Sequence, residues 1–211
     1  MAGMDHWQES VGRLLWDREI PLSVCVPYTL FVCSLVPVYW RYYGPANFLW
    51  FSDLALLITL AAVWLESPLL ASMQAVSVGL LELVWIADLV ARLVFGVRLV
   101  GMTDYMFKAE IPLLVRGLSL FHVVLPFLLF WLVYRLGYDE RAWMAQTLLA
   151  WAVLLACYAF TERSQNINWV FGPGKPQQWL PPRLYLLVLM VVLPVCIYLP
   201  THFFLRALVP K

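Results

Sequence analysis

Three ionisable side chains lie inside long apolar stretches of the sequence: Asp53, Glu82 and His122. Carboxyl and imidazole groups transfer protons, so this combination could supply a general base and the group that orients it. Placing a charge in hydrocarbon costs at least about 2.5–3.5 kcal/mol, which makes such residues candidates for a functional site. The alternative is that each group is kept neutral by burial and only bonds neighbouring helices.

Two serine hydroxyls accompany these residues. Ser52 directly precedes Asp53, and Ser119 lies three residues before His122, on the same face of a helix. A serine near a general base can act as a nucleophile. We therefore expect a catalytic set of His122, Asp53, Glu82 and Ser52, with Ser119 close to the substrate.

A late polar segment, residues 162–183, combines amide side chains with aromatic ones. This composition is typical of a loop that folds back onto the membrane surface or into the helices. The residues that we expect it to present to a substrate are Glu162, Asn166, Asn168 and Trp169.

A metal site is a further option for the ionisable residues. Asp53, Glu82, His122 and Glu162 would form a carboxylate-rich set of ligands. None of the spacings H-x-x-E-H, H-E-x-x-H or E-x-x-H occurs in the sequence, so the need for a metal is left open.

The elements that must position these residues are membrane helices. Of the 211 residues, 63% are hydrophobic and 13% charged, against about one half and one quarter in soluble domains. Apolar runs of about twenty residues, the length that crosses a bilayer, recur along the chain. The net charge of +1 offers no basic surface for nucleic acid, so the expected partners are membrane lipids; the oligomeric state stays open.

The apolar runs and the turn signals between them predict an all-α, polytopic bundle of about six transmembrane helices. We expect an N-terminal tail or interfacial helix at 1–19 and a single transmembrane domain at 20–211. The expected helices cover residues 20–43, 47–65, 69–95, 112–135, 141–161 and 184–205.

Alternating crossings place the candidate residues in one leaflet. At about 1.5 Å per residue, Asp53 lies roughly 9 Å and His122 roughly 13 Å from the face that carries the longer connectors, and we expect Glu82 in the same leaflet. The distribution of Lys and Arg favours cytoplasmic connectors only slightly, so the orientation is left open.

Two further polar pairs follow from the same counting. Asp88 and Arg92 are one helical turn apart, and we expect an ion pair at the rim of the membrane. Gln74 and Gln146 fall in the opposite leaflet, where we expect a structural contact between amides.

Two stretches, FLWFSDL at 48–54 and FHVVLPF at 121–127, resemble the androgen-induced (FAR-17a-type) membrane hydrolases. The resemblance implies cleavage of fatty-acid esters by a threonine and a histidine. Trp50 stands where that family has its threonine, and His122 lies one residue from the position of its histidine. The chain is more similar to uncharacterised bacterial integral membrane proteins, a likeness that implies the bacterial inner membrane and no particular activity.

The hypothesis that follows is an intramembrane lipid-active enzyme, with hydrolysis as one reaction, whose polar pocket opens to one leaflet. His122 would act as base, and Asp53 or Glu82 would orient it or activate water. Two alternatives stay open: a non-catalytic lipid-binding or assembly protein, and a small proton-coupled carrier. A carrier needs access to both faces, whereas these residues gather near one.

Overall fold

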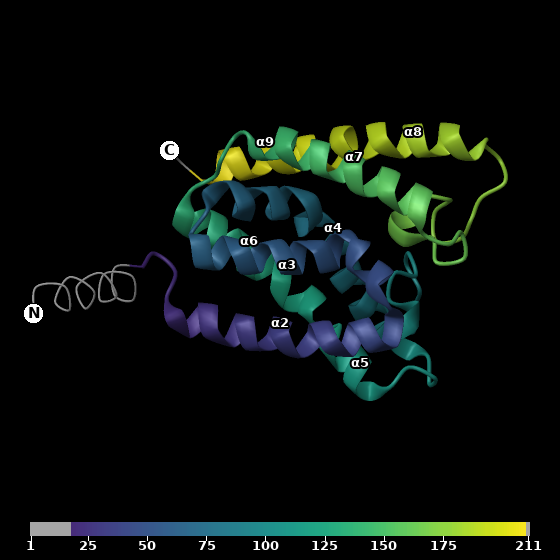
Figure 1. The fold of residues 1–211 in the computed structure, drawn as a ribbon, viewed down its shortest axis with the longest axis horizontal. Helices are drawn as coiled ribbons and strands as arrows, with labels where there is room; N and C mark the ends of the chain where they lie inside the picture. The colour runs from purple at the N-terminus through teal and green to yellow at the C-terminus, as the bar shows by residue number, and fades with distance from the viewer. Residues whose placement is uncertain (1–17, 210–211) are drawn as a thin grey trace, which may run out of the picture.

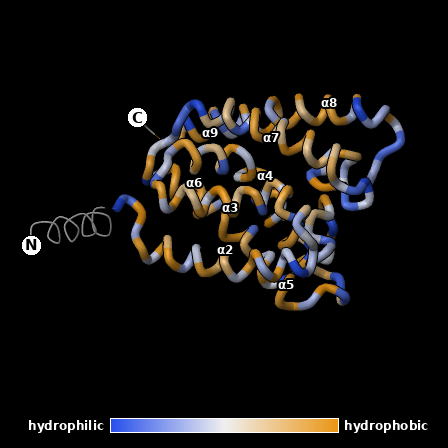
Figure 2. The backbone as a smooth tube through the Cα atoms, viewed as in Figure 1, coloured by the Kyte–Doolittle hydropathy of each residue, from blue (hydrophilic) through white to orange (hydrophobic). Residues whose placement is uncertain are grey.

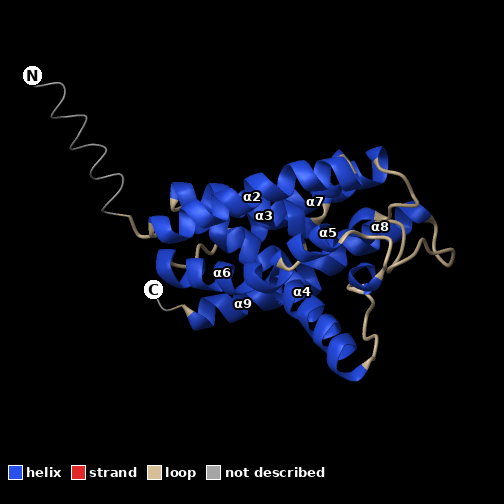
Figure 3. Cartoon of the chain, turned by 90° about the horizontal axis from the view of Figure 1, so that it is seen from below, coloured by secondary structure: helices blue, strands red, loops and turns tan. Residues whose placement is uncertain are grey.

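The computed structural model describes residues 18–209, and this part of the chain forms helices and loops without β-strands (Figures 1 and 3). The expected tail or interfacial helix at 1–19 lies almost wholly outside the described residues. The helical segments are α2 (Leu22–Tyr43), α3 (Phe51–Leu65), α4 (Pro68–Phe95), α5 (Leu113–Leu118) continued by α6 (Phe121–Leu136), α7 (Ala142–Phe160), and α8 (Pro182–Val192) continued by α9 (Leu199–Leu208). Counting the two continued pairs once each, the described chain has six long helices.

Four of these helices are long and apolar enough to cross a membrane: Leu22–Tyr43, Leu113–Leu136, Ala142–Phe160 and Pro182–Leu208. α3 is also apolar but is shorter, at 15 residues. Hydrophobic residues run along the helices, and hydrophilic residues gather at the ends of the bundle (Figure 2). These features indicate an integral membrane protein.

α4 is the central helix, and the other helices surround it. It contacts α3, α6, α7 and α9, and residues 71–79 are buried without interruption. The second half of α4 has one buried face, which holds Glu82, Trp85 and Asp88, while Leu83 and Val84 are exposed. A polar group on the buried face can bond a neighbouring helix or loop and does not face lipid.

Successive helices run in alternating directions (Figure 1). The loops at residues 44–50, 96–112 and 161–181 therefore lie together at one end of the bundle, which we call the connector end. The described chain begins and finishes at the opposite end, which we call the terminal end. Short 3₁₀ helices occupy parts of the three connectors, at Pro45–Leu49, Asp104–Phe107 and Ile167–Trp169.

Three of the expected helices depart from regular α-helix. The helix expected at 47–65 begins only at Phe51, after a 3₁₀ turn. The one expected at 112–135 is interrupted at Ser119 and Leu120, whose carbonyls accept tighter bonds from the amides three residues later, at 3.2 and 2.9 Å. These i to i+3 bonds turn the chain just before α6.

The last helix, expected at 184–205, contains a π-helical turn at Leu193–Tyr198. Pro194 has no amide hydrogen, so the carbonyl of Met190 loses its usual helical donor. The indole Nε1 of Trp151 on α7 donates to this carbonyl instead, at 2.8 Å. The bond compensates for the proline and ties α7 to α8.

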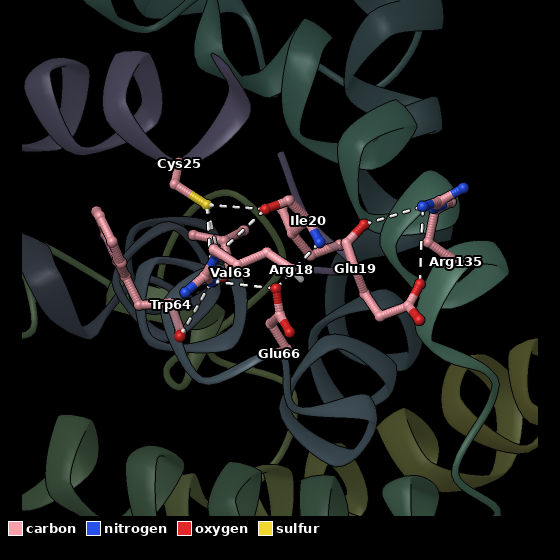
Figure 4. A network of polar contacts seen from close by, with 8 residues as sticks. All are labelled: Arg18, Glu19, Ile20, Cys25, Val63, Trp64, Glu66 and Arg135. Atoms are coloured by element: carbon pink, nitrogen blue, oxygen red, sulfur yellow. Dashed lines mark hydrogen bonds and ion pairs between the residues drawn. The ribbon is translucent and has the colours of Figure 1, made fainter. Parts of the chain in front are cut away.

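Arg18 fastens the beginning of the described chain to the turn between α3 and α4 (Figure 4). Its guanidinium donates to the carbonyls of Val63 and Trp64, at 2.7 and 3.2 Å, and pairs with Glu66 at 3.3 Å. The Glu66 carboxylate also accepts from the amide of Ile20, at 3.0 Å. The last carbonyls of a helix lack helical donors, so Arg18 satisfies groups that burial would otherwise leave unpaired.

Polar contacts at the terminal end bind α4 to its neighbours. Gln146 Nε2 donates to Ser77 Oγ at 2.8 Å, and Gln74 Nε2 is buried without a hydrogen-bond partner in the described chain. Gln146 therefore pairs with Ser77 and not, as expected, with Gln74.

In the turn before α7, a hydrogen bond from Arg141 holds the pKa of Asp139 below its ordinary value.

Asp88 binds the connector at residues 96–112, and the expected ion pair with Arg92 is wrong. Its Oδ1 accepts from the amides of Leu99, Val100 and Gly101, at 2.9–3.2 Å. Its Oδ2 accepts from the amide and hydroxyl of Thr103, at 3.0 and 2.8 Å. The chain turns back after α4 and presents its N–H groups to the carboxylate, while Arg92 pairs with Asp104.

Candidate functional site

The centre of the site is a bond between a carboxylate and an imidazole from two helices. Glu82 Oε2 on α4 and His122 Nδ1 at the start of α6 are 2.7 Å apart. Their side chains are 4% and 12% exposed, so water is largely excluded from the pair. The turn at Ser119 and Leu120 sets the direction from which His122 enters the bundle.

The His122 ring is held between two aromatic rings. Trp85 stacks on it with centroids 4.7 Å apart, and Phe121 with centroids 4.1 Å apart. Trp85 lies three residues after Glu82 and so presents the same face of α4. The second ring nitrogen, Nε2, makes no hydrogen bond to the residues that the structure describes.

This arrangement is suited to proton transfer. A carboxylate that accepts from Nδ1–H fixes the tautomer of the imidazole and stabilises its protonated form. Nε2 is then the nitrogen that can take a proton from water or from an alcohol. The pair therefore has the orientation that a general base requires.

Asp53 lies in the first turn of α3 and is 5% exposed. Its electrostatic partners include His122 and Glu82, and the amide of Asn47 lies beside it. Its Oδ1 is buried and has no hydrogen-bond partner within residues 18–209. The structure thus brings Asp53 to the Glu82–His122 pair while leaving one of its oxygens unused.

The hydroxyl of Ser119 is directed away from His122. Its Oγ donates to the carbonyl of Val115 at 3.2 Å and shares a hydrogen bond of 2.6 Å with the Tyr39 hydroxyl. Ser52 is half-buried, and neither serine is hydrogen-bonded to His122 in the described chain. The geometry therefore does not pair a serine nucleophile with the base.

Two tyrosines extend the polar cluster toward the connector end. Tyr39 and Tyr105 both interact with Ser119, and both interact electrostatically with Asp53. Burial raises the pKa of Tyr105, in the connector, above its ordinary value, so this phenol keeps its proton. The sequence did not predict Tyr39, Trp85 or Tyr105 as members of the site. Of these, only Trp85 could have been found, because its spacing from Glu82 puts both on the same face of a helix.

The expected substrate contacts of the loop at 161–181 are engaged in folding the loop itself. Asn168 accepts from the amide of Phe51 at 2.9 Å and donates to the carbonyl of Leu49 at 2.6 Å, which caps α3. Asn166 bonds the amide of Phe171 and the carbonyl of Gly172, at 2.9 and 2.8 Å. These side chains thus shape the loop and anchor it to α3.

The remaining two loop candidates, Glu162 and Trp169, make no hydrogen bond to the Glu82–His122 pair in the described chain. Glu162 is exposed and accepts from the Ser164 hydroxyl at 3.1 Å. Trp169 is half-buried with φ at +58°, within a tight turn that also holds Asn168 at +50°. Sequence order placed these residues near the same rim, but the loop directs Glu162 toward solvent.

We predict that Asn168→Ala lowers the free energy of unfolding by about 1–2 kcal/mol, because a helix cap is lost and alanine disfavours positive φ. The Asn168→Gly variant is the matched control, since glycine tolerates this φ without supplying the cap. We expect its loss to be smaller, as measured by unfolding in detergent. An alanine variant as stable as the parent would contradict the capping role.

The expected metal ligands are not assembled in the described part of the chain. Within residues 18–209 no three His, Cys, Asp or Glu side chains are grouped as metal ligands. Glu162 is exposed, whereas Asp53 and Glu82 are buried. The donor set of the site fits proton transfer better than metal binding.

Comparisons with protein-family models, curated proteins and solved structures found no match to this chain. A functional assignment therefore depends on the side chains described above.

Proposed function

We propose that this protein is an intramembrane enzyme that hydrolyses a lipid ester. The observation that carries the proposal is the 2.7 Å bond between Glu82 and His122, which leaves Nε2 free in a buried setting. If all six helices cross the bilayer, this pair lies in the leaflet at the connector end. A substrate would then come from the lipid of that leaflet.

The reaction that we assign uses water as the nucleophile. His122 Nε2 takes a proton from water, and the hydroxide adds to the ester carbonyl carbon. The bond between that carbon and the alcohol oxygen then breaks, and His122 returns the proton to the departing alkoxide. Glu82 accepts from Nδ1–H throughout and stabilises the transient imidazolium. Ester and water thus give a fatty acid and an alcohol.

Water is preferred over a serine for two reasons. The Ser119 hydroxyl already bonds Val115 and Tyr39. The resemblance to androgen-induced hydrolases supports an ester as the bond cleaved, but Trp50, at the position of their threonine, offers no hydroxyl.

Apolar packing on α4 between Glu82 and Ser77 supports an enzyme rather than a carrier. On α4, Glu82 lies nearer to the connector end than Ser77, which bonds Gln146. Between them, the Phe130 ring lies against Gly79, where an added Cβ would be 3.1 Å from the ring. Val78 is buried at the same level. Apolar packing here would interrupt a polar path for protons or ions.

The proposal is tested by incubating the purified protein in vesicles with a panel of acylglycerols and phospholipids and measuring released fatty acid by mass spectrometry. We expect release from at least one lipid ester, and we expect Ser119→Ala to retain most of that rate. Absence of release from every ester, with the protein folded, would overturn the proposal. If Ser119→Ala lowers the rate of release as much as a His122 variant does, the nucleophile is Ser119 and not water.

A further inference from the structure

We infer that the site recognises a phosphate-free lipid headgroup that donates a hydrogen bond, through a hydroxyl or an amine, to Asp53. This inference rests on the proposed function because it names the class of its substrate. It is argued from two unpaired polar atoms and from the charges around them.

The two atoms belong to side chains of α3 and α4, two helices that are in contact. Asp53 Oδ1 is an acceptor and Trp85 Nε1 is a donor, and both are buried without partners in the described chain. Their residues are 5% and 2% exposed. Buried polar atoms are nearly always hydrogen-bonded, so both atoms are available to a bound molecule that offers a donor and an acceptor. A headgroup that both donates and accepts, such as one with a hydroxyl, satisfies the pair.

The residues that carry these atoms interact with the proposed reaction centre. Trp85 stacks on the His122 ring at 4.7 Å. Asp53 interacts electrostatically with both His122 and Glu82. A headgroup bound between Asp53 and Trp85 would therefore hold its ester close to the general base.

The charges of the cluster disfavour an anionic headgroup. It contains two carboxylates, Asp53 and Glu82, and one group that can become positive, His122. The side chains that interact with Asp53 are His122, Glu82 and Asn47. Phosphate recognition usually relies on Arg or Lys, and this acidic cluster supplies neither.

Three basic side chains in and beside the connector at residues 96–112 already have partners. Arg92 and Arg98 both pair with Asp104. Arg116 donates to the carbonyl of Met106 at 3.0 Å. Recruiting any of them to a phosphate would break a contact that shapes the connector.

Binding of ether lipids tests the inference without relying on turnover, because an ether cannot be hydrolysed by this chemistry. The probes are 1-O-hexadecylglycerol, hexadecylamine and 1-O-hexadecylglycerol 3-phosphate, added to the protein in nanodiscs, with Trp fluorescence as the signal. We expect the phosphate probe to bind at least about tenfold more weakly than the better of the other two. A difference of this size corresponds to the loss of at least one charge-assisted hydrogen bond. Equal binding of the phosphate probe would overturn the inference.

Two substitutions at Asp53 identify the donor. Asp53→Leu removes the acceptor, and we expect about a tenfold loss of binding for the preferred probe. Asp53→Asn keeps an acceptor but removes the charge: retained binding supports a hydroxyl donor, and lost binding supports an amine. Thermal unfolding of both variants shows that they fold, and a folded Asp53→Leu variant that binds unchanged would contradict the inference.

The two proposals fail differently. If the alkylglycerol or the amine binds through Asp53 but no ester is hydrolysed, the enzyme proposal fails and the inferred headgroup stands. If phospholipids are hydrolysed as fast as neutral esters, the enzyme proposal stands and the inferred headgroup fails.

Discussion

Replacing His122 by alanine is expected to lower ester turnover by about 10²–10⁴-fold, the usual contribution of a positioned general base. The imidazole is the group in this cluster whose free nitrogen can take a proton from water, and Glu82 holds it in place. Turnover is measured as fatty acid released from the lipid ester that the parent protein hydrolyses best.

A matched variant separates the chemical role of His122 from its structural role. Alanine leaves Glu82 buried without its partner, which by itself destabilises the fold. The side chain of asparagine is shorter than histidine but can still donate to Glu82, while it has no basic nitrogen. We therefore expect His122→Asn to be as inactive as His122→Ala and more stable in detergent. A folded His122→Asn variant with normal turnover would remove His122 from the reaction.

Glu82→Gln refines the same test. The amide oxygen can still accept from Nδ1–H, but the charge that stabilises the imidazolium is lost. We expect turnover between that of the parent and that of His122→Ala. A Glu82→Gln variant that is fully active would show that the carboxylate only packs the two helices together, as in the non-catalytic alternative.

The largest effect on stability is expected from Asp88→Ala, at about 3 kcal/mol. The carboxylate is fully buried and accepts five hydrogen bonds from residues 99–103. Hydrogen bonds to a charged group contribute roughly 1.5–3 kcal/mol, and water can replace part of that loss at the connector. Denaturant unfolding measures the change, and hydrogen exchange at Leu99, Val100 and Gly101 reports the opening of the connector.

The control for Asp88 is Arg92→Ala, one turn further along α4. Arg92 is about a third exposed and pairs with Asp104 at the surface, so its loss is expected to cost less than about 1 kcal/mol. Equal destabilisation by the two substitutions would mean that Asp88 does not hold the connector.

The sequence by itself determined the class of protein and the approximate places of its helices. Apolar runs and Gly or Pro turns are local signals, so the ranges expected at 20–43, 69–95 and 141–161 differ from α2, α4 and α7 by at most two residues. The constant rise of a helix also allowed Glu82 and His122 to be placed in the same leaflet, and they are in contact.

The tertiary structure alone decided which polar groups meet. Gln146 bonds Ser77, Asp88 bonds the connector, and Asn168 caps α3, each across a separation in sequence that no local pattern describes. These choices depend on how the helices rotate and tilt against α4, and on the irregular turns before α6 and after α8. Packing therefore decided that Glu82, and not Asp53, bonds His122, and that Asp53 Oδ1 is buried without a hydrogen-bond partner in the described chain.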